Sequence, residues 1–141
     1  MDCIPVHEAK FTIVISWLGL FFFGAVFGTT FFVFDINNAE EFGPFVAAAG
    51  FFGLVTLAFL LMVIAVRRHQ MLLYEDFFVY TPYFARPKTY SYSQIYKLSL
   101  ARQSYRLYSP KGKCLAAFED NMENVPMAID FLRSKGIRIE V

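Results

Sequence analysis

The stretch "MVIAVRRHQMLLYEDFFVYT", Met62 to Thr81, changes its surroundings twice within twenty residues. It begins at the end of a long apolar run, passes through two arginines and a histidine, and then returns to short runs of apolar residues. The first change indicates that the chain leaves a membrane. The second indicates that it enters the core of a small sheet.

Two uncharged segments precede this stretch, residues 11–34 and residues 42–66, with 24 and 25 residues. Each is longer than the roughly 20 residues that span a bilayer as a helix. Buried helices of a soluble protein are disfavoured, because 141 residues would leave too little polar surface to cover both. A cleaved signal peptide is disfavoured as well, since its apolar part is usually about 7 to 15 residues long. The sequence therefore predicts two transmembrane helices.

The charges that flank these segments predict their orientation. Lys10 precedes the first segment and Arg67 and Arg68 follow the second, whereas the connection "DINNAEE", residues 35–41, has three acids and no Lys or Arg. Positively charged flanks stay on the cytoplasmic side. We therefore expect a cell-membrane protein with two spans, a short extracytoplasmic turn at 35–41, and cytoplasmic segments 1–10 and 67–141. On that reducing side Cys3 and Cys114 are expected to be free thiols.

Residues 67–141 carry a basic charge balance and the pattern of a sheet. They hold 12 Lys and Arg against seven acids. "MLLY" and "FFVYT" read as two strands around a turn at Glu75 and Asp76. "YSYSQIYKLSL", residues 90–100, alternates as a half-buried strand or as two strands joined by a bend. "SPKGK", residues 109–113, has the turn chemistry of a hairpin.

The period changes once more near the C-terminus. Val125, Ala128 and Leu132 follow helical spacing, with Asn124 as the expected N-cap and Gly136 beyond the last turn. We predict a helix at about 124–135, followed by "IRIEV" as a tail or edge strand. The predicted fold class is an α+β membrane protein, in which a two-helix transmembrane hairpin precedes a small antiparallel domain closed by a C-terminal helix.

This order of elements resembles the bacterial pleckstrin-homology-like (PH-like) membrane proteins. The resemblance rests on "YSYSQIYKLSL" and on "SPKGKCLAAFEDNMENVPMAIDFLRSKGI", which is similar to the closing hairpin and helix of that family. It implies a PH-like domain at residues 67–141. A full PH fold has seven strands and a helix, and this length accommodates about six strands, so one strand is missing or supplied by the tail. Phosphoinositide-binding members carry Lys and Arg after their first strand, where we expect Glu75 and Asp76, so specific inositol-phosphate binding is not expected.

The sequence carries no catalytic or metal-binding pattern. It contains no glycine-rich phosphate loop, no paired zinc ligands and no serine elbow. His69 is interpreted as a polar residue at the membrane boundary. The sequence therefore predicts a protein without enzymatic activity, without a cofactor and without nucleic acid as a partner.

Two groups of residues are candidate interaction sites. The first is a basic set that could contact anionic lipid or a protein partner. Its members are Arg67, Arg68, Arg86, Lys88, Arg102, Arg106, Lys111 and Lys113. The second group consists of small residues in the apolar segments, which allow close helix packing within the hairpin, in a homo-oligomer or with another protein. Its members are Gly24, Gly28, Gly43, Ala47, Gly50 and Gly53.

These features favour a non-enzymatic, membrane-anchored PH-like interaction module. In this hypothesis the domain presents a protein-binding or anionic-lipid-binding sheet at the cytoplasmic surface, where an exposed strand edge can recruit an extended peptide. The alternative is an accessory or structural subunit of a larger transporter or channel, in which the helical hairpin is the contact surface.

Overall fold

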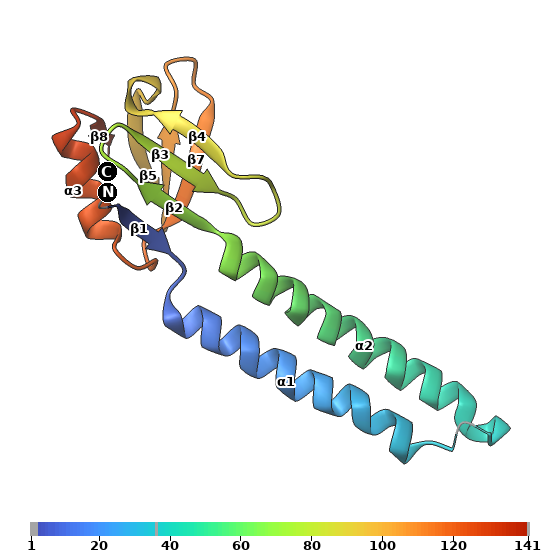
Figure 1. Ribbon diagram of the computed structural model, residues 1–141. Coiled ribbons are helices and arrows are strands. Elements are labelled where there is room, and N and C mark those ends of the chain that lie inside the picture. The colour runs from blue at the N-terminus through green and yellow to red at the C-terminus, as the bar shows by residue number, and fades with distance from the viewer. Residues whose placement is uncertain (1–2, 36, 141) are drawn as a thin grey trace. The chain divides into compact units, whose positions relative to one another are not determined.

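The computed structural model describes residues 3–35 and 37–140 and divides the chain into two compact units. The helical hairpin comprises residues 10–66. The sheet domain combines the segment before the hairpin, up to Ala9, with the chain from Arg67 onward (Figure 1). The hairpin is thus inserted into the sheet domain, whereas the sequence analysis assigned the N-terminal segment to no domain.

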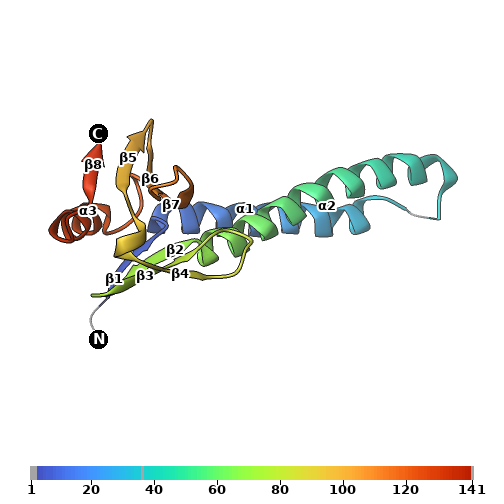
Figure 2. The ribbon, with the colours of Figure 1, turned by 90° about the horizontal axis from the view of Figure 1, so that it is seen from above.

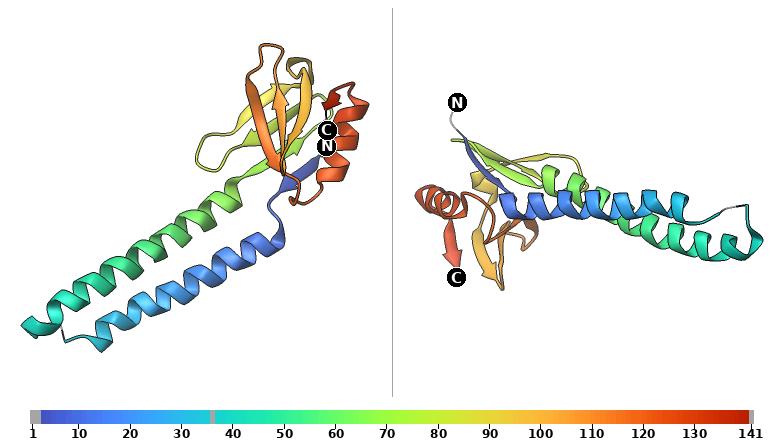
Figure 3. Two further views of the ribbon diagram at one scale, coloured as in Figure 1. Left: turned by 180° about the vertical axis from the view of Figure 1, so that it is seen from behind. Right: turned by 90° about the horizontal axis from the view of Figure 1, so that it is seen from below.

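The hairpin consists of two long apolar helices. α1 spans Lys10–Val33 and α2 spans Ala39–Arg68, and the two run side by side (Figures 1 and 3). Their most apolar windows have mean hydropathies of 2.1 and 2.6, and only 6% and 17% of those residues are buried. Asn38 starts α2 by accepting a hydrogen bond from the Glu40 N–H at 3.1 Å. Both helices are therefore long and apolar enough to span a membrane, as predicted.

The first sheet of the domain contains strands from both sides of the hairpin. Its order is β1 (Ile4–His7), β2 (Gln70–Leu73), β3 (Phe77–Thr81) and β4 (Lys88–Ser91), with every pair antiparallel. His7 lies opposite Gln70 in the β1–β2 register. The strands predicted at "MLLY" and "FFVYT" are confirmed as β2 and β3. Because β1 is the first strand, the interpretation that Glu75 and Asp76 follow the first strand is wrong, and they join β2 to β3 instead.

The second sheet has the order β7-β6-β5-β8. These strands are β5 (Lys97–Ala101), β6 (Ser104–Tyr108), β7 (Cys114–Glu119) and β8 (Arg138–Glu140). The alternating segment at 90–100 therefore forms two strands, β4 and β5, which a short 3₁₀ turn at Tyr92–Gln94 directs into different sheets. The C-terminal tail pairs parallel to β5, so this sheet is mixed and not purely antiparallel.

A single core holds the two sheets and helix α3 (Val125–Ser134) together (Figure 2). Val6 from β1, Phe78 from β3 and Leu132 from α3 are all fully buried in it. Asn124 precedes α3 with a φ of 65° and makes no side-chain cap. Its amide instead donates to the Pro5 carbonyl at 2.7 Å, which ties the start of α3 to β1. Asn124 is therefore the N-cap residue of α3, as predicted, although its side chain does not cap the helix.

Candidate functional site

An exposed apolar residue projects from the connection between β3 and β4. We call residues 82–87 the Phe84 loop, because 66% of the Phe84 surface is exposed there. Arg68, the last residue of α2, donates from its guanidinium to the Ala85 carbonyl at 3.4 Å. Arg86 lies in the same loop, and Lys88 begins β4 directly after it. An aromatic ring and three exposed cations thus gather around this loop.

The remaining members of the basic set do not lie together. Arg102 occupies the turn between β5 and β6 with a φ of 61°, whereas Lys111 and Lys113 occupy the turn between β6 and β7. These turns lie at opposite ends of β6, and Arg106 lies within that strand. Arg67 is exposed next to Arg68 at the end of α2. The eight cations therefore form several exposed sites and not one continuous patch.

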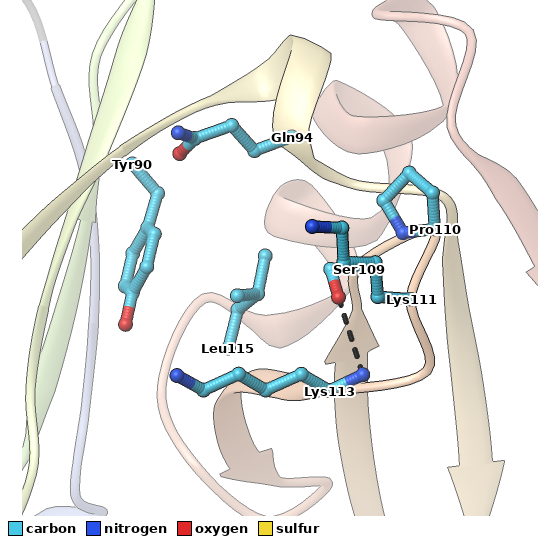
Figure 4. Close-up of a pocket in the computed structure, with 7 residues that line it drawn as sticks. All are labelled: Tyr90, Gln94, Ser109, Pro110, Lys111, Lys113 and Leu115. Carbon is cyan, nitrogen blue, oxygen red and sulfur yellow. Dashed lines mark hydrogen bonds between the residues drawn. The ribbon is translucent and has the colours of Figure 1, made fainter.

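An apolar cavity of about 310 Å³ opens beside the turn between β6 and β7 (Figure 4). We call it the edge pocket, because its walls come from β4 and β7, the outer strands of the two sheets. Tyr90 and Leu115 line opposite sides, Pro110 contributes from the turn, and the side chains of Lys111 and Lys113 lie along the rim. The structure thereby places two members of the predicted basic set next to a cavity that the sequence did not indicate.

A buried polar cluster joins the two chain segments that flank the hairpin. Nδ1 of His69 lies 2.9 Å from Oε1 of Glu8, and both side chains are at most 5% exposed. The Tyr83 hydroxyl donates to the same Oε1 at 3.0 Å, and its ring stacks on the His69 ring at 4.0 Å. Nε2 of His69 lies 3.2 Å from the Ala117 carbonyl oxygen. His69 is therefore a buried, fully partnered residue, whereas the sequence was interpreted as placing a polar residue at the membrane boundary.

The surroundings of this cluster keep the hydroxyl groups of Tyr80 and Tyr83 protonated. Burial raises the pKa of the Tyr83 hydroxyl, and the neighbouring Glu8 raises it further. Burial also raises the pKa of Tyr80, whose hydroxyl lies 3.4 Å from Nε2 of His69. A small cavity of about 120 Å³ borders these rings. Because Oε1 of Glu8 and both ring nitrogens of His69 are occupied by one another and by their neighbours, we interpret the cluster as a structural fastening of β1.

The candidate packing residues divide into two groups. A Cβ atom at Gly53 would lie 3.2 Å from the Phe27 ring, and one at Gly24 would lie 3.8 Å from Thr56. No atom lies within 4 Å of a Cβ placed on Gly28, Gly43 or Gly50, and Ala47 is exposed. Among the glycines of the hairpin, Gly19 is packed most tightly, because a Cβ there would overlap the Phe59 ring. Gly19 was not predicted as a packing residue, because no second glycine lies four residues away from it.

No protein-family model matches the chain, and no curated protein sequence is significantly similar to it. Within residues 3–35 and 37–140, no group of three or more His, Cys, Asp or Glu side chains could hold a metal ion. Cys3 and Cys114 are free thiols, as expected. The Phe84 loop and the edge pocket are the candidate interaction surfaces of the sheet domain.

Proposed function

We propose that the protein is a non-enzymatic, membrane-anchored interaction module. The helical hairpin crosses the cell membrane twice, with both termini cytoplasmic. The PH-like sheet domain lies at the cytoplasmic surface, where its basic residues bind anionic lipid or a protein partner. Anionic headgroups contribute roughly 1 kcal/mol per Lys or Arg held near the surface, so several exposed cations give weak but useful attraction.

The PH-like assignment gains support from the number of strands. β1 and the six strands β2 to β7 precede α3 in the chain, which equals the seven strands and C-terminal helix of that fold. In the proposed PH-like domain the first of these seven strands is β1, which comes from the segment before the hairpin and not from the tail. The hairpin therefore replaces the connection between the first two strands, where phosphoinositide-binding members carry their cations. This supports the expectation that the domain has no preference for one phosphoinositide.

The observation that carries the lipid-binding proposal is the Phe84 loop. Arg68 follows the uncharged part of α2 by two residues, so in a spanning helix it lies at the headgroups. Its hydrogen bond to the Ala85 carbonyl then brings the loop to the same level. An exposed phenylalanine beside Arg86 suits that interface, because the ring enters the apolar boundary while the guanidinium binds headgroup phosphates.

A second candidate function is that of a subunit of a larger membrane complex. Gly43, Ala47 and Gly50 lie on α2 at intervals of four and three residues, and all three are exposed. In a bilayer, such a row allows another helix to approach closely. This function requires a protein that binds the hairpin, whereas the preferred function requires only lipid or a ligand of the sheet domain.

Purification in mild detergent distinguishes the two functions. The module predicts a protein that purifies without a stoichiometric partner and carries anionic phospholipid, whereas the subunit predicts a second protein in fixed ratio. The orientation is tested on intact cells with single cysteines and an impermeant thiol reagent, in a background without Cys3 and Cys114. Asn37→Cys should be labelled and Ser134→Cys should not. The cysteine is placed at Asn37 and not at the neighbouring Asn38, because the Asn38 side chain caps α2. Labelling of Ser134→Cys alone would overturn the orientation.

A further inference from the structure

The edge pocket has walls that the fold holds in place. Gly112 adopts a φ of 75° in the β6–β7 turn, and its N–H donates to the Ser109 carbonyl at 2.9 Å. The Ser109 hydroxyl accepts from the Lys113 N–H at 3.1 Å, and the Ser109 N–H donates to the Lys113 carbonyl at 2.9 Å. These bonds close the turn on itself. The backbone positions of Lys111 and Lys113 at the rim are therefore well determined.

A β-bulge directs an apolar side chain into the pocket wall. Leu107 lies opposite Ala116 and Tyr108 lies opposite Cys114, so Leu115 is the extra residue of β7. Bulges re-aim side chains and disturb the regular spacing of edge N–H and C=O groups. On the other wall, the Tyr90 ring is fixed by stacking on Phe78 with centroids 5.2 Å apart. The pocket thus has rigid apolar walls beside an edge that is poorly suited to adding a peptide strand.

The charge at the rim indicates what the pocket binds. Neither Lys111 nor Lys113 forms an ion pair with any residue in the described part of the chain. Figure 4 shows the Lys113 side chain extended along the rim, past Leu115, toward the Tyr90 side of the pocket. Gln94 and Ser109 also line the pocket, and its remaining lining residues, Tyr90, Pro110 and Leu115, supply the apolar surface. A volume of about 310 Å³ lies at the small end of the ligand pockets of roughly 300 to 1,000 Å³. Two unpaired ammonium groups beside an apolar wall are complementary to one anionic group on an apolar chain.

We propose that the edge pocket binds a fatty acid, with its chain between Tyr90 and Leu115 and its carboxylate on Lys111 and Lys113. Each ammonium donates charge-assisted hydrogen bonds to the carboxylate, and the apolar walls remove the chain from water. The lysine stems cover the chain while their charged ends stay at the surface. This site is separate from the Phe84 loop, so fatty-acid binding and membrane-surface binding can be tested independently of one another.

Photolabelling of the full chain tests this proposal. The protein is placed in nanodiscs of zwitterionic phosphatidylcholine, exposed to decanoic acid bearing a diazirine near the end of its chain, irradiated, digested and mapped by mass spectrometry. Adducts are expected on peptides that contain Tyr90 and residues 109–115. The Lys111→Gln/Lys113→Gln variant should reduce these adducts several-fold. The matched Arg102→Gln/Arg106→Gln variant removes the same amount of charge from the β5–β6 turn and from strand β6. It should leave the amount of adduct in the pocket unchanged.

Two further measurements separate the pocket from general apolar labelling. The corresponding diazirine alcohol lacks the carboxylate and should label the pocket several-fold less than the acid. Leu115→Trp, which fills the cavity while both lysines remain, should also reduce labelling by the acid. Adducts confined to residues 10–66, equal labelling by acid and alcohol, or undiminished labelling of the double Gln variant would each overturn the proposal.

Discussion

Oε1 of Glu8 lies 2.9 Å from Nδ1 of His69, although 61 positions separate these residues in the chain. Glu8 lies two residues before α1, and His69 follows α2 directly. Their contact therefore closes the sheet domain at the point where the helical hairpin leaves and returns. β1 is held further by the Asn124 amide on the Pro5 carbonyl and by burial of Val6. The N-terminal segment is thus an integral part of the sheet domain.

Loss of the Glu8 carboxylate should destabilise the sheet domain. Glu8→Ala leaves the buried His69 and Tyr83 donors without their acceptor, at a cost on the order of 2 to 4 kcal/mol. Glu8→Gln keeps an acceptor oxygen and should cost less. Glu123→Gln is the matched control, because this partly exposed acid lies 3.6 Å from His7 of β1 and should change stability by less than about 1 kcal/mol. Thermal unfolding measures all three, and equal effects of Glu8→Ala and Glu123→Gln would contradict the fastening role.

The sheet domain should fold without the hairpin only when β1 is retained. His7 lies opposite Gln70, so a short Gly-Ser linker can join residues 1–9 to residues 67–141 as a tight β1–β2 connection. This linked fragment should unfold cooperatively by circular dichroism. A fragment that begins at Gln70 exposes the β2 edge and the core position of Val6, and should be unfolded or aggregated. Equal stability of the two fragments would show that β1 is dispensable.

Stability of the linked fragment should fall at alkaline pH. Burial raises the pKa of both Tyr83 and Tyr92 above the usual value of about 10. Above pH 10 the unfolded chain loses these protons while the folded domain keeps them, so folding becomes less favourable as the pH rises. Below about pH 10 both tyrosines are protonated in the folded and in the unfolded chain, so their contribution to the stability is fully present. Urea unfolding should show a smaller alkaline decline in Tyr83→Phe/Tyr92→Phe, and an identical decline would argue against buried neutral tyrosines.

Glycine substitutions should separate packing inside the hairpin from packing outside it. Gly19→Ile must displace the Phe59 ring, so it should lower the thermal stability of the full chain in detergent. Gly28→Ile meets open space within the hairpin and should leave that stability unchanged. Size measurements in the same detergent complete the comparison. If Gly28→Ile dissociates an oligomer, the open face of α1 contacts another helix, as the subunit function requires.

The sequence predicted the elements whose signals are local. Two uncharged runs identified the helices, alternation identified the strands around Tyr90 and Leu98, and helical spacing with Gly136 identified α3. β1 was missed because "IPVH" is short, contains a proline, and forms its sheet only by pairing with β2 across the whole hairpin. Such long-range pairing leaves no periodic signal in four residues.

The candidate sites were predictable to a smaller extent. The basic residues could be counted, but their division among the Phe84 loop, strand β6 and the turns at its two ends depends on which strands pair. The edge pocket requires Tyr90 and Leu115, which belong to different sheets, to lie on facing walls. Phe84 carried a recognisable signal, a phenylalanine between Pro82 and Pro87 beside Arg86, which favours an exposed loop.

The lipid-binding account is tested most directly by placing a fluorescent reporter in the Phe84 loop. Trp17 is the only tryptophan of the chain and lies outside the linked fragment, so Phe84→Trp makes that fragment a single-tryptophan protein. Phe84→Trp/Arg86→Gln/Lys88→Gln is the matched control for charge. Vesicles of phosphatidylserine, phosphatidylcholine and individual phosphoinositides are added, and the indole emission is recorded.

The account predicts a blue shift with phosphatidylserine vesicles at about 50 mM salt that is lost by about 300 mM, as screening shortens the range of the charges. Phosphatidylcholine vesicles should give no blue shift, and the control variant should give a smaller shift with phosphatidylserine. The shifts with individual phosphoinositides should follow the charge of each headgroup and show no further preference. No shift with phosphatidylserine at low salt, or tight binding to a single phosphoinositide that survives high salt, would contradict the account.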